Sequence, residues 1–319
     1  MRLDLKPNSN THYLSSELIE RGVNTMAIDN LKFDEQVIID IQKTIFNFYD
    51  TQDIKYSKNE KPKDTLLYFI TFLIKKIPIC KRNVHFSDVL ENSQHISVLG
   101  KYADGFRNGA DMNIFLSNKT CNPKQPDFFL YCWNIYHLHI NNQMNKKRSE
   151  LQLLCIVSDN DVYFVDVIEH PSKKCPDRYF NIQHLETIKR NNWMEQIGFE
   201  EMESLVPNSL EPKITESKDI FKMYTKGINI PFEFDGQAYI PIRGITCAKS
   251  PIIATNEIIK ITRNIHLLMP LAPGYIGFNL IICNGELCGD ASFLTSKNEI
   301  THYNIFNDNQ IIYVKQLIK

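Results

Sequence analysis

The central segment of this chain is Ile135-Tyr136-His137-Leu138-His139-Ile140. β-branched and aromatic residues dominate it, so it predicts a β-strand. Alternate side chains of a strand point to the same side of a sheet, which places His137 and His139 on one face and Leu138 on the other. The sequence thus predicts two neighbouring imidazoles on a single sheet face.

Two further strands follow and are expected to form a hairpin. They are predicted at residues 151–157 and 162–168, on either side of a turn at Ser158-Asp159-Asn160-Asp161. The hairpin ends in Glu169-His170, which brings a third histidine toward the same sheet.

The same alternation predicts which side chains of the last strand lie together. We expect Phe164, Asp166, Ile168 and His170 to share one face. Tyr163 falls on the opposite face of an ideal strand and can join them only through a β-bulge.

The region before these strands is predicted to be mainly helical. Apolar residues recur at three- and four-residue spacing from Glu35 to Tyr49, and Asp34 precedes them as an N-cap. A second helix is expected at residues 65–76, and Ser87-Asp88 is an N-cap signal for a third. Residues 100–117 are expected to combine helix with irregular turns, because three glycines interrupt them.

The region after His170 is predicted to mix helices and strands. A helix is expected at residues 181–194, and the acidic residues 200–217, which include two prolines, predict a linker. Beyond the linker we expect strands at residues 228–234, 237–242, 275–283, 286–294 and 309–317, and a helix at residues 255–268.

These elements predict an α+β protein with a helical N-terminal part, a central antiparallel β-hairpin sheet with helices, and a C-terminal α+β part. We expect three domains, at residues 1–120, 121–200 and 218–319. The central domain would carry the histidines.

Composition narrows the function only a little. The chain has 319 residues with Lys+Arg 36 and Asp+Glu 37, a formal net charge of -1, so no global positive field indicates nucleic-acid binding. The longest apolar run, residues 66–74, is far shorter than the roughly 20 residues of a membrane span. Residues 1–10 lack the apolar core of a secretory signal, which predicts a cytoplasmic protein without a membrane partner. The eight cysteines show no metal-type spacing and are expected to be reduced thiols.

The predicted histidine face suggests acid–base chemistry on RNA. Cleavage at a 2′-hydroxyl needs a base, an acid for the leaving 5′-oxygen, and cations near the phosphate. The predicted catalytic residues are His137, His139, His170 and the phosphate clamp Arg148, and the predicted substrate-binding residues are Lys146, Lys147 and Tyr163. No metal or other cofactor is needed for these roles, so the leading prediction is a metal-independent endoribonuclease.

Other interpretations of the same residues stay open. An H-x-H strand with a third histidine can instead hold a divalent metal such as Zn or Fe through neutral imidazoles. Strand histidines can also be half-buried, bonded to backbone groups and without a catalytic role. Arg178 and His184 fit the R-x(5)-H spacing of HEPN-type ribonucleases, in which one helix presents both residues, but this pair precedes the predicted helix.

Two segments carry a resemblance. Residues 109–117 follow the pattern G-x-D-x-N-x-x-L-S, and residues 133–139 follow W-x-I-x-H-L-H. Together with the hairpin ending at His170 and with Trp193, they resemble a group of bacterial proteins that share both segments, over about residues 105–195. The resemblance implies a bacterial accessory protein of toxin or phage-defence type and carries over no activity. Tyr136 stands where a second histidine is common in that group, so the histidine cluster is thinner here.

We therefore expect RNA as a substrate, and a cognate antitoxin or a defence-complex subunit as a protein partner. The alternative from another class is a non-catalytic binding or scaffold module of a defence complex. A nuclease is expected to lose activity on RNA when His139 becomes alanine while keeping its melting temperature, whereas loss of a structural histidine is expected to lower stability.

Overall fold

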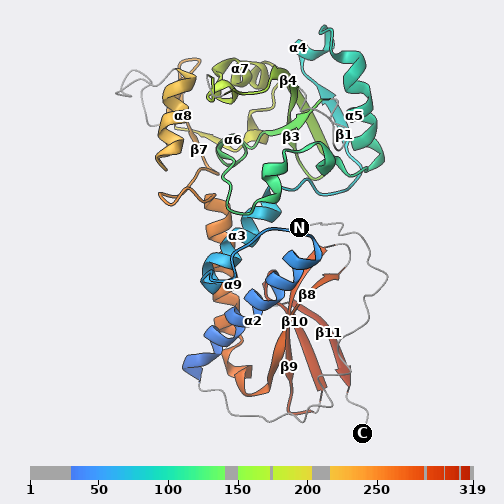
Figure 1. Ribbon diagram of the computed structural model, residues 1–319, viewed down its shortest axis with the longest axis vertical. Helices are drawn as coiled ribbons and strands as arrows, with labels where there is room; N and C mark the ends of the chain where they lie inside the picture. Colours follow the sequence, from blue (N-terminus) through green and yellow to red (C-terminus); the bar gives the residue numbers. More distant parts are fainter. Residues whose placement is uncertain are drawn as a thin grey trace. The chain divides into compact units, whose positions relative to one another are not determined.

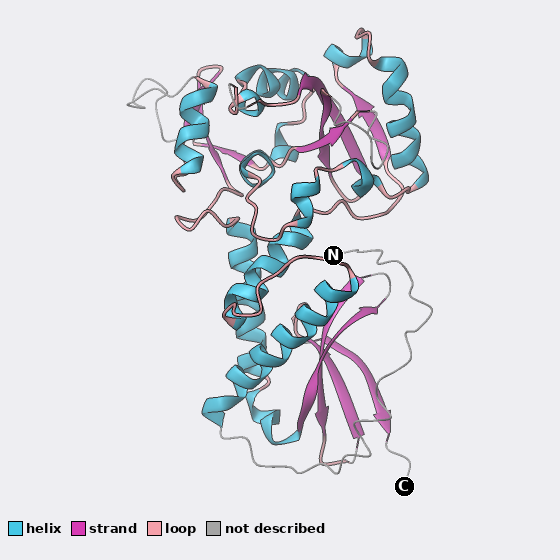
Figure 2. Ribbon diagram, in the orientation of Figure 1, coloured by secondary structure: helices cyan, strands magenta, loops and turns pink. Residues whose placement is uncertain are grey.

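The computed structural model describes residues 30–140, 150–172, 175–202, 216–283, 286–297, 299–308 and 310–316. The chain divides into two compact units (Figure 1): the first is formed from residues 1–70 and 256–319, and the second from residues 71–255. Helices and mainly antiparallel sheets occur together (Figure 2), so the protein belongs to the α+β class, as predicted.

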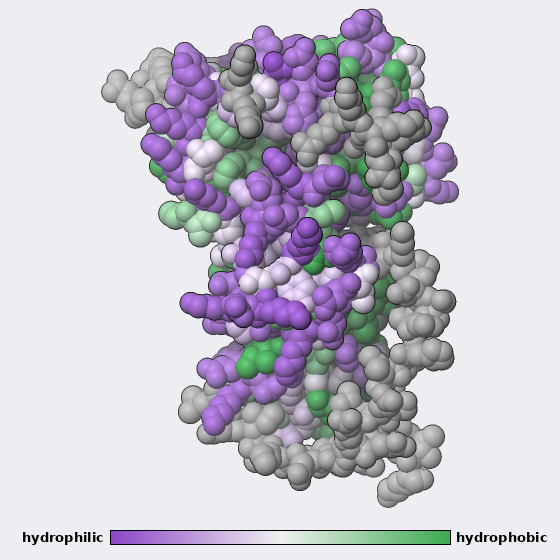
Figure 3. Space-filling model, viewed as in Figure 1, coloured by the Kyte–Doolittle hydropathy of each residue, from purple (hydrophilic) through white to green (hydrophobic). Residues whose placement is uncertain are grey.

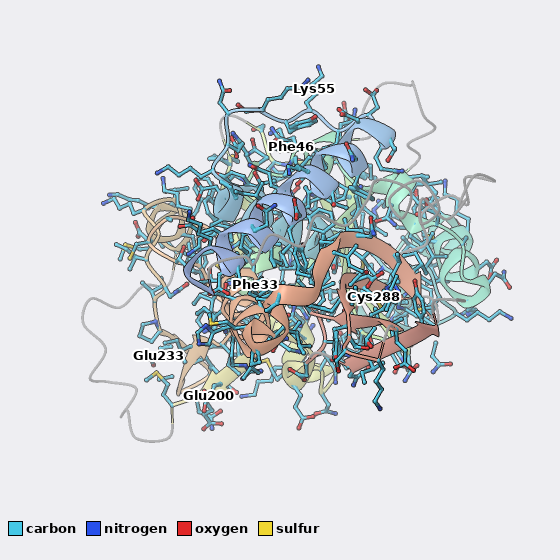
Figure 4. All side chains as sticks on the ribbon, turned by 90° about the horizontal axis from the view of Figure 1, so that it is seen from below. Phe33, Phe46, Lys55, Glu200, Glu233 and Cys288 are labelled. Atoms are coloured by element: carbon cyan, nitrogen blue, oxygen red, sulfur yellow. The ribbon has the colours of Figure 1, made fainter. Side chains whose placement is uncertain are left out.

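The first unit packs helices against a four-stranded antiparallel sheet of order β11-β10-β9-β8. Its elements are α2 (Asn30–Thr51), most of α3 (Pro62–Ile74), most of α9 (Ile252–Leu267), η6 (Met269–Gly274), β8 (Tyr275–Cys283), β9 (Glu286–Leu294), β10 (Glu299–Asn304) and β11 (Gln310–Gln316). Phe33, Val37 and Ile41 recur every four residues on α2 and are buried. The ring of Phe33, labelled in Figure 4, lies 5.5 Å from that of Tyr275 on β8, which attaches the helix to the sheet.

The second unit contains the histidines and two sheets, of order β1-β4-β3-β2 and β5-β7-β6. Its strands are β1 (Asn83–Phe86), β2 (Tyr136–His139), β3 (Leu151–Val157), β4 (Asp161–Glu169), β5 (Phe199–Glu201), β6 (Phe232–Phe234) and β7 (Gln237–Pro241). Its helices are α4 (Asp88–Glu91), α5 (Ile96–Asn108), η1 (Met112–Phe115), η2 (Asn118–Cys121), α6 (Phe128–Trp133), η3 (Arg178–Phe180), α7 (Ile182–Arg190), η4 (Met194–Ile197) and α8 (Ser217–Thr225).

Helices cover both faces of the β1-β4-β3-β2 sheet. Leu138 on β2 is buried against residues of α5, including Leu99. Leu154 on β3 belongs to the other cluster, which α6, α7 and α8 complete. Because His137 is the cross-strand partner of Leu154, it lies on the α7 side together with His139. The alternation predicted for the first histidine strand is therefore confirmed.

Strand β4 carries one extra residue. Leu154 on β3 pairs with Asp166, whereas the next residue, Cys155, pairs with Phe164, so Val165 has no partner on β3. This is a β-bulge, and it shifts the alternation of side chains along β4 by one residue.

The bulge changes which side chains of β4 lie together. Phe164 packs on the α5 side of the sheet, whereas Tyr163 and Ile168 lie on the α7 side. The prediction that Phe164 shares a face with Ile168 is therefore wrong, because it assumed a regular strand. Tyr163 lies on the histidine side of the sheet because of this bulge, which is the one way in which the sequence allowed it to join that face.

The predicted domain boundaries differ from the observed units. β1, from the predicted N-terminal domain, pairs in parallel with β4. Trp133 Nε1 donates a hydrogen bond of 3.3 Å to the hydroxyl of Tyr224 on α8, from the predicted C-terminal domain. The predicted linker begins inside β5, which pairs with β7, and its residues 203–215 lie outside the described residues. Strand pairing and burial thus join segments that are distant in sequence.

Most predicted elements are present, and three strands, β1, β5 and β10, were missed. The predicted helices at residues 35–49, 65–76, 181–194 and 255–268 correspond to α2, α3, α7 and α9. β10 was not predicted because Thr301, His302 and Asn304 are polar although they are buried. None of the described helices combines the length and apolar character needed to cross a bilayer. The side of the second unit seen in Figure 3 is mainly hydrophilic, with small apolar areas between polar ones.

Candidate active site

The two strand histidines lie on the α7 side of the sheet at different depths. His139 pairs with Gln152 across the strands, and only 2% of its surface is exposed. The side chain of His137 is 13% exposed. Both side chains are therefore largely buried, and so is the sheet face that was predicted to carry them.

A hydrogen-bonded chain determines the tautomer of His139. The hydroxyl of Tyr179 donates to Gln152 Oε1 over 2.7 Å, which orients the amide. The amide nitrogen of Gln152 then lies 3.4 Å from His139 Nε2. An amide nitrogen only donates, so His139 Nε2 accepts and the neutral ring carries its proton on Nδ1. The nitrogen of His139 that faces Gln152 is therefore already engaged.

His170 stacks on His139 and is the more accessible of the two. The ring centroids lie 5.3 Å apart with 24° between the planes, and His170 is half-buried. Its Nδ1 lies 2.7 Å from the carbonyl oxygen of Pro171. A carbonyl only accepts, so this nitrogen carries a proton and Nε2 of the neutral ring keeps its lone pair. The backbone N–H of His170 donates to Glu150 O, which places His170 beside the end of the segment that joins β2 to β3.

The surroundings of His137 favour its neutral form. Its ring lies 4.8 Å from the ring of Tyr179, and its Nδ1 lies 3.8 Å from Asp127 Oδ2. Burial lowers the pKa of His137, the carboxylate of Asp127 opposes this, and His170 lowers that pKa further. Asp127 is held in place as the N-cap of α6, because Leu130 N–H donates to its Oδ1 over 3.1 Å.

A fourth histidine lies on the same side of the sheet. His184 of α7 is 3% exposed, and its Nδ1 lies 3.5 Å from Asp166 Oδ2 on β4. Asp166 was expected to share one face with His170, and the structure places its carboxylate beside His184. Arg178 belongs to η3 and donates to Glu169, so Arg178 and His184 are not presented by one helix as the R-x(5)-H pattern requires.

Sequence reasoning missed Gln152, Tyr179 and Asp127. Gln152 stands alone as a polar residue in the apolar strand β3, which is a signal of a buried hydrogen bond. Asp127 precedes the apolar run of α6 as an N-cap does. Tyr179 carries no local signal, because its contacts come from β2 and β3.

Of the predicted substrate-binding residues, the structure describes only Tyr163. Arg148, Lys146 and Lys147 lie outside the described residues. Tyr163 contacts His85 and Trp193 instead, near the other end of the hairpin. Along β4, Tyr163 and Ile168 are separated by roughly 15 Å.

The described residues include no group of three or more His, Cys, Asp or Glu side chains arranged to hold a metal ion. The site is thus a histidine cluster in an α+β unit, supported by the amide of Gln152, the phenol of Tyr179 and the carboxylates of Asp127 and Asp166. No protein-family model, curated protein or solved structure matches this chain.

Proposed function

We propose that the second unit is a metal-independent endoribonuclease in which His137 and His170 act as base and acid. The observation that carries this proposal is the half-buried ring of His170 stacked on the buried ring of His139. A histidine at the surface with one nitrogen committed to a carbonyl presents its other nitrogen in a defined direction, as general acid–base catalysis requires.

The roles follow from the environments of the two rings. Burial keeps His137 neutral at neutral pH, so it can accept the proton of a 2′-hydroxyl. The oxygen then attacks phosphorus, the bond from phosphorus to the 5′-oxygen breaks, and protonated His170 gives its Nε2 proton to the leaving oxygen. The products are a 2′,3′-cyclic phosphate and a 5′-hydroxyl, and no metal takes part.

The other predicted residues have supporting roles in this proposal. His139 orients His170 rather than exchanging protons with substrate, because it is buried and its Nε2 is bonded to Gln152. Arg148, Lys146 and Lys147 follow β2 in the chain and would supply the cations that stabilise the charged phosphate. With the resemblance of residues 109–117 and 133–139, the proposal includes a cytoplasmic role of toxin or phage-defence type, with an antitoxin or a defence-complex subunit as partner.

The test is cleavage of single-stranded RNA of mixed sequence by the full chain in the presence of a chelator. We expect His170→Gln to lower the rate at least about 100-fold with an unchanged melting temperature. His266→Gln is the matched control, because that histidine is 67% exposed in the first unit. RNA left intact by the wild-type protein, cleavage that the chelator abolishes, or equal rates for wild type and His170→Gln would overturn the proposal.

A second candidate is a non-catalytic binding or scaffold module of a defence complex. The burial of His137 and His139 favours it, since a buried, hydrogen-bonded histidine can serve packing alone. This candidate predicts intact RNA with the wild-type protein and effects of histidine substitutions on stability only.

A further inference from the structure

Three aromatic rings form a continuous row at the β1 edge of the sheet. The rings of His85 on β1 and Tyr163 on β4 are stacked, with centroids 4.8 Å apart and planes inclined by 16°. Tyr163 in turn contacts Trp193, which follows α7, at 5.1 Å. His85 and Tyr163 are direct partners in the parallel pairing of β1 with β4, so the strand register itself aligns them. We call His85, Tyr163 and Trp193 the aromatic row.

The aromatic row is accessible from solvent. The side chain of His85 is 43% exposed, and Tyr163 and Trp193 are half-buried. One ring face of His85 lies on Tyr163, and the imidazole is the most exposed of the three rings. This exposure lets a flat aromatic ligand reach the imidazole and continue the stack.

A carboxylate completes the group. His85 Nε2 lies 2.8 Å from Asp161 Oδ1, and the amide nitrogen of Asn83 donates to the same oxygen over 3.1 Å. Both contacts lower the pKa of Asp161, so it is ionised at neutral pH. Asp161 Oδ2 makes no hydrogen bond with the described residues, and the carboxylate is 29% exposed. Asp161 Oδ2 is therefore available as a hydrogen-bond acceptor beside the ring of His85.

We propose that the aromatic row and Asp161 form a nucleobase-binding site, in which a base stacks on His85 and donates an N–H to Asp161 Oδ2. The ionised carboxylate of Asp161 accepts an N–H from a base and repels a phosphate, so the site suits the base. The choice of RNA as the source of the base rests on the proposed function. Base–aromatic stacking of this kind tolerates different bases, and the hydrogen bond favours those that carry an exocyclic amino group.

The fluorescence of Trp193 reports binding through the stack, because Tyr163 contacts both Trp193 and His85. The chain has two tryptophans, and the other, Trp133, is fully buried at 0% exposure. The ligand is a short 2′-O-methyl oligoribonucleotide, which lacks the attacking 2′-hydroxyl and so cannot be cleaved by the proposed reaction. Binding is thereby measured separately from catalysis, and failure of one does not imply failure of the other.

We expect the oligonucleotide to quench the fluorescence of wild-type protein, and Trp193→Phe to remove the signal. His85→Leu should weaken binding about five-fold or more, the loss of one stacking contact. His266→Leu is the matched control, because His266 also lies near a carboxylate, with Nδ1 3.6 Å from Asp34 Oδ2, and contacts no aromatic ring among the described residues. Equal quenching by an oligonucleotide of the same length without bases, or unchanged affinity of His85→Leu, would overturn the proposal.

Discussion

The ring of His170 lies 5.3 Å from the ring of His139, nearly parallel to it, and only the first of the two reaches solvent. The buried ring of His139 is held by Gln152, and the half-buried ring of His170 is held by the carbonyl of Pro171. In the proposed function, His170 can therefore contact a substrate, and His139 positions His170.

Because His139 is buried, His139→Ala should destabilise the protein. We expect it to lower the free energy of unfolding by about 2 kcal/mol or more, because it leaves a cavity and removes the partner of Gln152. Urea unfolding measures this, with the exposed His266→Ala as control. A variant as stable as the wild type would show that the site relaxes around the lost ring. From the sequence we expected His139→Ala to keep the melting temperature of a nuclease. The burial of His139 leads us to expect a lower stability instead.

Removing the hydroxyl of Tyr179 should disturb the whole chain of hydrogen bonds. Tyr179→Phe leaves Oε1 of the fully buried Gln152 without its 2.7 Å donor, which is expected to cost about 1–3 kcal/mol of stability. Denaturant unfolding is the measurement. Tyr56→Phe is the control, because that exposed hydroxyl donates to Asp50 and should matter much less. Equal effects of the two substitutions would contradict the expectation.

His137 should make the protein acid-sensitive. Because burial lowers its pKa below the ordinary value of about 6.5, the unfolded chain binds a proton at a pH at which the folded chain does not. Stability from this group is present above about pH 6.5 and is lost as the pH falls. We expect His137→Asn to lose less stability than wild type between pH 7.5 and pH 5 in urea titrations. The same pH dependence in both proteins would argue against a neutral His137.

Lys75 should make the stability of the protein depend on pH in the alkaline range. It is buried, donates to the carbonyl oxygens of Asn122 and Gln125, and burial lowers its pKa to about 8. Between about pH 8 and 10.4 the unfolded chain keeps the proton that the folded chain has released, so the contribution of Lys75 to stability rises with pH.

The difference in unfolding free energy between wild type and Lys75→Met should therefore grow over this interval, toward a limit on the order of 3 kcal/mol. The exposed Lys81→Met serves as control. A constant difference between pH 8 and pH 10 would mean that the amine keeps its ordinary affinity for protons.

Two glycines with left-handed backbones should respond differently to alanine. Gly227 has φ +78°, and a Cβ there would lie 2.7 Å from Cys247 O. Gly236 has φ +73° and open space around the same position. Gly236→Ala is expected to cost roughly 1 kcal/mol from the backbone alone, and Gly227→Ala at least twice this, because a carbonyl must also move. Thermal unfolding of both variants tests this, and similar losses would contradict it.

Local patterns in the chain were sufficient to predict most helices and strands. The three- and four-residue spacing of residues such as Val37, Ile41 and Ile45 predicts α2, and the alternation around His137 and His139 predicts that they share one face. The spacing of apolar residues and the capping residues of helices depend on neighbours within a few positions. They can therefore be recognised before any tertiary contact is known.

Tertiary structure alone decided the bulge at Val165, the addition of β1 beside β4, and the contacts of Tyr179. Each depends on a partner many residues away, whose register no local period encodes. The sequence therefore determined that histidines share a sheet face. Only the folded chain determined which of them is buried, which is half-buried, and which tyrosine, amide and carboxylate contact them.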